Sequence, residues 1–205
     1  MAGDRKLVKD EAPPRELHPV EDSPYPARCV DCIDLGLNPE SFEGSDPVLK
    51  DKVALIFRTT ALDKKNRPFE IGIEFNCTFG KKANLRKFAE AWRGKPYTED
   101  EARKQGIPLE KFVGVPALLT IIHATSGKGN EYAKIGGISK LPAAMASLAP
   151  DEEGYERAKW WEDKKAEYAR AAALHNDKHP AGGTSKITDL PEIDMDDPDG
   201  DALPF

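Results

Sequence analysis

The stretch over residues 69–79 constrains the fold of this chain more than any other. Its odd positions, from Phe69 to Phe79, are apolar, and its even positions are polar or glycine. An alternation of period two predicts a strand that turns one face to a core and the other to solvent. Such a strand needs neighbouring strands and an apolar layer over its buried face, so a sheet-based domain is expected.

The flanking segments supply the neighbouring strands. Residues 25–35 and 52–59 are rich in β-forming residues and predict two earlier strands, the first ended by Gly36. Residues 116–124 and 131–141 predict two later strands, joined by a turn at residues 126–130.

A helical pattern interrupts these strands. Leu85, Phe88, Ala89 and Trp92 recur at the spacing of one apolar helix face, and Gly94 follows them. Thr98 begins a capping box for a second, short helix. Three strands, a helical insertion and two more strands predict a mainly β fold, namely a five-stranded OB-type Greek-key barrel with the insertion between strands 3 and 4.

Four segments are expected along the chain. Residues 1–24 predict a flexible arm, residues 25–142 the OB-fold domain, residues 143–178 a helical extension, and residues 179–205 a linker with an acidic tail. The extension is Ala-rich and charged, which predicts a long C-terminal helix. Packing of this helix on the barrel is favoured over self-association into a homo-oligomer or binding of a partner.

Charge is distributed unevenly along the chain. Residues 50–140 hold 18 Lys and Arg against 10 Asp and Glu, a net charge of +8, whereas the first 49 residues carry −6. Residues 187–205 hold seven acids and no Lys or Arg. A basic block indicates phosphate binding, although a solvated basic surface fits it equally well. The opposite charges suggest that the tail covers the basic block when no nucleic acid is bound.

Binding of single-stranded nucleic acid needs cations along the backbone and aromatic faces for the bases. Lys52 and Arg58 share one face of a predicted strand. The candidate contacts are Lys52, Arg58, Lys64, Lys65, Arg67, Phe69, Lys81, Lys82, Arg86, Arg93, Lys95, Tyr97, Lys128, Tyr132 and Lys134.

The C-terminal segment is acidic, rich in Pro and Gly, and ends in an apolar tip. Its few apolar residues have no helical or strand period, so it cannot build a core. An apolar tip on an anionic string can instead dock in a basic pocket with an apolar floor on a partner. The residues of this pattern are Asp196, Asp197, Asp199, Asp201, Leu203, Pro204 and Phe205.

This tail resembles the tail of bacterial and phage single-stranded DNA-binding proteins. The middle of the chain is similar to a group of small phage-encoded proteins of that kind, over residues 28–36, 84–97, 114–120 and 132–135. The resemblance implies an OB fold that coats and protects single-stranded DNA without strong sequence preference. It also implies a tip that recruits replication, recombination or repair proteins.

Other functions fit less well. The chain has no Walker loop, no His-Glu-x-x-His and no Gly-x-Ser-x-Gly, so no enzymatic activity is expected. Cys29 and Cys32 form a lone Cys-x-x-Cys on a strand, where they would point to opposite faces, so neither a metal nor a cofactor is expected. An OB-like adaptor that binds only proteins, or an RNA-binding OB protein, remain the alternatives.

No apolar run approaches the ~20 residues that span a membrane, and the first 20 residues have no apolar core of a signal peptide. We therefore expect no membrane partner and a cytoplasmic protein, in the host cytoplasm if the chain is phage-encoded.

Overall fold

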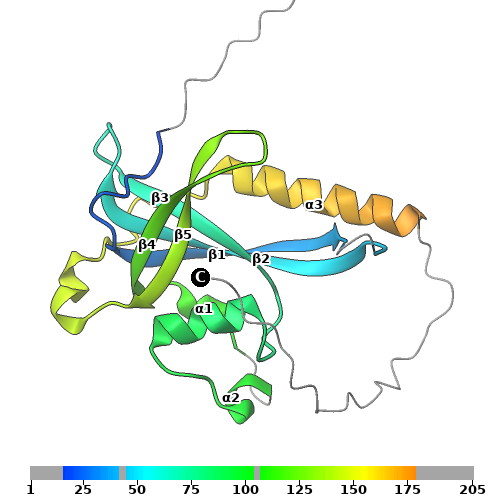
Figure 1. Ribbon diagram of the computed structural model, residues 1–205, viewed down its shortest axis with the longest axis horizontal. Coiled ribbons are helices and arrows are strands. Elements are labelled where there is room, and N and C mark those ends of the chain that lie inside the picture. Colours follow the sequence, from blue (N-terminus) through cyan, green and yellow to red (C-terminus); the bar gives the residue numbers. More distant parts are fainter. Residues whose placement is uncertain (1–15, 42–44, 104–106, 179–205) are drawn as a thin grey trace, which may run out of the picture.

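A computed structural model describes residues 16–41, 45–103 and 107–178 of the chain. Five strands form one antiparallel sheet in the order β3-β2-β1-β4-β5 (Figure 1). The strands are β1 (Tyr25–Glu40), β2 (Val48–Leu62), β3 (Pro68–Asn76), β4 (Pro116–Thr125) and β5 (Glu131–Lys140). The expected mainly β class is confirmed, and the open sheet with its helices is consistent with an OB-like fold.

Three short helices follow β3 and precede β4, and two helical segments follow β5. They are α1 (Asn84–Arg93), α2 (Glu99–Arg103), η1 (Leu109–Phe112), η2 (Ala143–Leu148) and α3 (Lys159–Lys178). Gly94 ends α1 in the left-handed conformation, with φ 74°, and its N–H bonds to Glu90 O. Thr98 and Glu101 form the reciprocal bonds of the predicted capping box, at 3.2 and 2.8 Å.

Strand β1 continues past the glycine at which it was predicted to end. Gly36 adopts φ 76° at a register shift between β1 and β2, so this glycine permits a bulge and the strand runs on to Glu40. A second register shift lies between Cys29 and Asp31. Cys29 is in the main core and Cys32 packs against that same core, so the expected opposite orientation of the two thiols is wrong. The extra residue of the bulge interrupts the alternation of side chains, so Cys29 and Cys32 reach the same face of the sheet.

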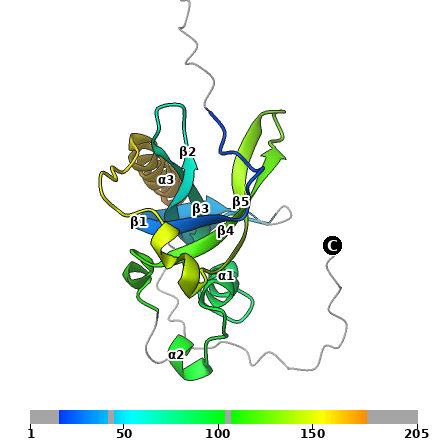
Figure 2. The ribbon, with the colours of Figure 1, turned by 90° about the vertical axis from the view of Figure 1, so that its left-hand side faces the viewer.

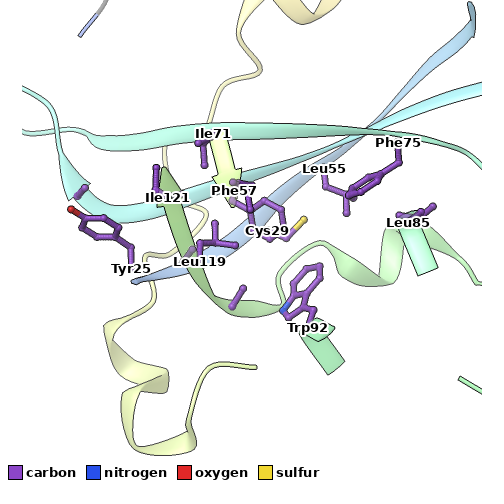
Figure 3. Packing of buried hydrophobic residues seen from close by; sticks show 14 of the residues in the cluster. Tyr25, Cys29, Leu55, Phe57, Ile71, Phe75, Leu85, Trp92, Leu119 and Ile121 are labelled. Carbon is purple, nitrogen blue, oxygen red and sulfur yellow. The ribbon is translucent and has the colours of Figure 1, made fainter. Parts of the chain in front are cut away.

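The main core lies between the sheet and α1 (Figure 3). Alternate residues of β2, among them Leu55 and Phe57, point into it together with Leu119 of β4. From α1, Leu85 and Trp92 face these side chains, as the helical spacing predicts. The indole of Trp92 lies 5.2 Å from the ring of Phe57, measured between centroids.

Helix α3 covers the opposite face of the sheet from α1 (Figures 1 and 2). Its residue Trp161 is buried with Val30 and Ile33 of β1 and with Ala54 and Ile56 of β2. The packing of the C-terminal helix on the sheet, favoured from the sequence, is what the structure shows. Strand β2 is therefore buried on both faces.

Residues 16–24, the described part of the predicted arm, pack against the sheet. His18 is buried, with its ring Nε2 2.7 Å from the Thr59 hydroxyl of β2. Its backbone oxygen accepts a hydrogen bond from His123 Nε2 of β4, at 2.7 Å. The arm thus joins two strands of the sheet. In the described ranges, no helix has the length and apolar character needed to cross a membrane.

Candidate nucleic-acid interface

The sheet face under α3 holds two of the predicted phosphate contacts. Arg58 is only 6 % exposed, donates to Glu70 Oε1 at 3.1 Å and to the Glu153 backbone oxygen at 2.7 Å. Lys52 forms an ion pair with Glu40. The two residues do share a strand face, but that face is occupied. Both cations are engaged in contacts within the protein and are not available to a nucleic acid in this conformation.

The same face is also unfavourable in charge. Asp31 accepts hydrogen bonds from Tyr155 and Arg157, at 2.9 and 2.7 Å. Glu74 accepts from Lys164 and, at 2.8 Å, from the Tyr168 hydroxyl. Displacing α3 and the residues just before it would leave the carboxylates of Asp31 and Glu74 facing solvent. A polyanion would be repelled there, so the covered face is a poor phosphate groove.

Two predicted cations near α1 are held by local partners. Arg86 is buried, bonded to Glu90 Oε1 at 2.8 Å and to the Tyr97 backbone oxygen at 2.7 Å. Arg93 bonds to Glu101 Oε1 at 2.7 Å and lies 4.4 Å from the Tyr97 ring centroid. The hydrogen bond from Arg93 lowers the pKa of Glu101 to about 2. Arg86 and Arg93 therefore brace the segment after α1, and Tyr97 is half-buried with them.

Three predicted lysines remain exposed on the α1 side of the sheet. Lys81 lies 3.5 Å from Glu99, whereas Lys82 and Lys95 have no ion-pair partner among the described residues. They lie around α1 and the loop that leads into it, at the lower side of the molecule in Figures 1 and 2.

The turn between β2 and β3 presents further cations. Lys64 and Lys65 are exposed, with no ion-pair partner for their side chains in the described ranges. Arg67 bonds to Asp63, at 2.7 Å, and this contact lowers the pKa of the carboxyl group. Asp63 Oδ1 also accepts from the backbone N–H groups of Lys65 and Arg67, at 2.8 and 2.9 Å. The Asp63 carboxylate thus fixes the turn, and two free lysines project from it.

The hairpin of β4 and β5 offers an aromatic side chain beside cations. Tyr132 is 43 % exposed, and Lys134, two residues on, is exposed with the same parity along β5. Ile122, 40 % exposed, pairs with Lys134 across the hairpin. Lys128 lies in the exposed turn. An uncovered apolar surface with lysines at its side can take both bases and phosphates.

These two turns project from the same end of the molecule (Figures 1 and 2). The arm contributes there too, because Glu16 Oε2 accepts from the backbone N–H of Lys64 at 3.2 Å. Phe69 is half-buried against His18, with ring centroids 5.0 Å apart, and is not an open stacking face. We call this end the turn surface; it consists of Lys64, Lys65, Ile122, Lys128, Tyr132 and Lys134.

The structure thus separates the predicted contacts into three places. Lys52 is paired with Glu40 and Arg58 is buried against Glu70 and the segment before α3. The residues from Lys81 to Tyr97 surround α1, and the turn surface contains most of the others. The tail residues Asp196, Asp197, Asp199, Asp201, Leu203, Pro204 and Phe205 lie outside the described residues.

Sequence reasoning missed Ile122, which was counted as part of an apolar strand. The sequence did contain an indication of its exposure, because Ile122 lies two residues after the polar, exposed Thr120 and so points to the same face of the strand. It also missed a pocket of about 620 Å³ between α1, η1 and the adjoining ends of β4 and β5. Only folding brings those four segments together.

The cysteines carry no reactive signature. Burial raises the pKa of Cys29 to about 12 and that of Cys32 to about 11, so both stay protonated thiols near neutral pH. No group of three or more His, Cys, Asp or Glu within the described part of the chain could hold a metal ion.

No protein-family model matches the chain, and no curated protein sequence matches it.

Proposed function

We propose that this chain is a single-stranded DNA-binding protein that coats the strand without strong sequence preference. Its strands would form an OB-type Greek-key barrel with α1, α2 and η1 as the insertion between β3 and β4. The strand order, with β1 between β2 and β4, supports that topology. The acidic tip would recruit replication, recombination or repair proteins.

The observation that carries the proposal is the outer face of the β4–β5 hairpin. Tyr132 is exposed beside Ile122, and Lys128 and Lys134 have no ion-pair partner among the described residues. Aromatic stacking is tolerant of base identity and lysine contacts read only the phosphate backbone. Both features predict binding of a single strand with little sequence preference.

The test is a titration of the full chain with poly-dT at two salt concentrations, with duplex DNA of equal length in parallel. We expect saturable binding of the single strand that weakens with salt, because phosphate contacts release counterions. Duplex binding should be much weaker, since stacked bases are not available to Tyr132. Equal affinity for both forms, or no binding to either, would overturn the proposal. A poly-U arm distinguishes RNA from DNA preference.

A second candidate function is that of a protein-binding adaptor. The observation that favours it is that α3 covers one face of the sheet, where Trp161 is buried against residues of β1 and β2. An adaptor would show no binding in the poly-dT titration and would still bind proteins through Phe205.

A further inference from the structure

The pocket beside α1 has an apolar floor. The floor includes Trp92 of α1 and Phe112 of η1, whose rings stack with centroids 5.3 Å apart, together with Val115 and Leu141. A volume of about 620 Å³ is within the range of pockets that hold a small molecule. The pocket shares no residue with the turn surface, so what it binds does not depend on nucleic-acid binding there.

The rim of the pocket is positively charged. Lys95, Lys111 and Lys140 line it from the loop after α1, from η1 and from the end of β5. All three are exposed, and none has an ion-pair partner among the described residues. Glu101 is the one acid in the described lining, and it is bonded to Arg93 at 2.7 Å. An anionic group at the rim would therefore meet three cations, and a cationic group would be repelled.

The rings of the pocket favour an aliphatic ligand over an aromatic one. Trp92 is only 4 % exposed and stacks on Phe112, so little of its ring surface is open to a ligand. Tyr97 has the Arg93 guanidinium 4.4 Å from its ring centroid and the Phe79 ring at 5.1 Å in a T-shaped contact. A nucleobase would need an open ring face for stacking. An aliphatic chain needs only apolar contact, which the floor supplies.

We propose that this pocket binds a fatty-acid-like monocarboxylate, with its aliphatic chain on the apolar floor and its carboxylate among Lys95, Lys111 and Lys140. The three lysines line a single apolar pocket, which matches one charged group joined to one apolar chain. A free molecule is favoured over a lipid in a bilayer, because proteins enter a bilayer with apolar side chains that project from their surface. Here the apolar side chains form the floor of a pocket.

Chain length and head-group charge give two separate expectations. Each methylene that the floor covers should tighten binding about fourfold, so decanoate should bind roughly 15-fold more tightly than octanoate. Decylamine has the same number of carbons as decanoate and is positively charged at neutral pH, so the three lysines should repel it. A pocket that selected for apolar character alone would bind decanoate and decylamine alike.

The tryptophan indoles provide the measurement. Trp92 Nε1 donates to Pro116 O at 2.9 Å, and both residues line the pocket. Trp160 and Trp161 lie on α3, on the opposite face of the sheet (Figure 1). In ¹H–¹⁵N NMR spectra of the full chain, titrated with decanoate below the concentration at which it forms micelles, we expect a saturable shift of the Trp92 indole signal. The signals of Trp160 and Trp161 should stay in place.

A pair of charge-reversal variants ties the binding to the rim. Lys111 is exposed, so Lys111→Glu should fold. It should raise the Kd for decanoate by about 2- to 30-fold, because losing an exposed ion pair costs up to about fivefold and the reversed charge adds a repulsion of similar size. The matched control is Lys165→Glu, which makes the same change at an exposed lysine of α3 and should leave the Kd unchanged.

The proposal is wrong if decanoate does not shift the Trp92 signal, or if decylamine binds as tightly as decanoate. It is also wrong if Lys111→Glu binds decanoate as tightly as the wild type does. A larger Trp92 response to phosphatidylglycerol vesicles than to decanoate would assign the rim to a bilayer surface and overturn it. A Trp92 shift with oligo-dT but not with decanoate would assign the pocket to the nucleic acid and equally overturn it.

Discussion

Gly72 illustrates how one residue determines whether a helix can cover a sheet. An added Cβ at this position would lie 2.3 Å from Trp161 Cζ2 and 2.9 Å from Ile56 Cδ1. Both distances are shorter than atoms tolerate, and a buried ring cannot turn away as the end of a lysine can. The absence of a side chain at position 72 is what lets the indole of α3 touch the strand.

We expect Gly72→Ala to destabilise the protein by about 1–3 kcal/mol, the usual cost of overpacking a core. Urea denaturation followed by tryptophan fluorescence measures this cost. Gly80→Ala is the control, because a Cβ there meets nothing within 4 Å and its φ is not positive. Equal stability of the Gly72 variant and the wild type would show that Trp161 does not pack as described.

At the scale of the element, the β4–β5 hairpin carries the proposed binding. We expect Tyr132→Ala to lower affinity for poly-dT by about 1–3 kcal/mol, roughly 5- to 150-fold, because one base stack is lost. Lys128→Ala and Lys134→Ala should each reduce the slope of log K against log salt by about 0.7, one phosphate contact on a single strand. Titration at four salt concentrations measures both effects.

The controls for the hairpin come from α3. Leu174 is 56 % exposed and Lys165 is exposed, and both lie outside the turn surface. Leu174→Ala should leave the affinity unchanged, and Lys165→Ala should leave the salt slope unchanged. If the hairpin variants bind like the wild type while binding itself persists, the strand contacts another part of the molecule, and the lysines around α1 become the next candidates.

At the scale of the whole molecule, His18 connects the arm to two strands of the sheet, β2 and β4. Its Nδ1 lies 2.7 Å from the Pro19 backbone oxygen, which can only accept, so Nδ1 carries the proton. Nε2 of the neutral ring then accepts from the Thr59 hydroxyl. Burial lowers the pKa of His18, and the nearby His123, which itself lies 3.5 Å from Glu131, adds to that effect.

This arrangement predicts a pH dependence of stability. The pKa of His18 is lower in the folded protein than the ordinary value of 6.5, so the unfolded chain binds the proton first as pH falls. Stability should therefore drop below pH 6.5, with a slope of at most about 1.4 kcal/mol per pH unit, and level off below the folded pKa. Urea midpoints between pH 5 and pH 7.5 measure it, above the range in which Asp63 and Glu101 titrate.

The variant His18→Gln should flatten this pH dependence, because it removes the titrating group while keeping a polar side chain near Thr59. The control is His175→Gln in the last turn of α3, which lies away from the arm and should keep the slope. A wild-type stability that is constant over this range would mean that His18 is protonated in the folded state as readily as in the unfolded one.

The sequence alone determined the type and order of the main elements of this protein, although not the end of β1. The alternation of Phe69–Phe79 predicted β3, the spacing of Leu85 and Trp92 predicted α1, and Thr98 predicted the start of α2. These signals are local, because a strand has period two, a helix has period 3.6, and a cap needs only its own turn. The composition of residues 153–175 predicted the long C-terminal helix, and its packing on the sheet was the favoured interpretation.

Only the tertiary structure decided which of the predicted contacts are exposed. Arg58 and Lys134 both appear in the sequence as cations on strands, yet Arg58 is buried against the segment that precedes α3 and Lys134 is exposed on the hairpin. Strand β1 changes face at bulges that no sequence period predicts. The pocket beside α1 is lined by residues as far apart in the chain as Ala89 and Leu141. Burial depends on which surface each face meets, and that is a property of contacts between distant residues.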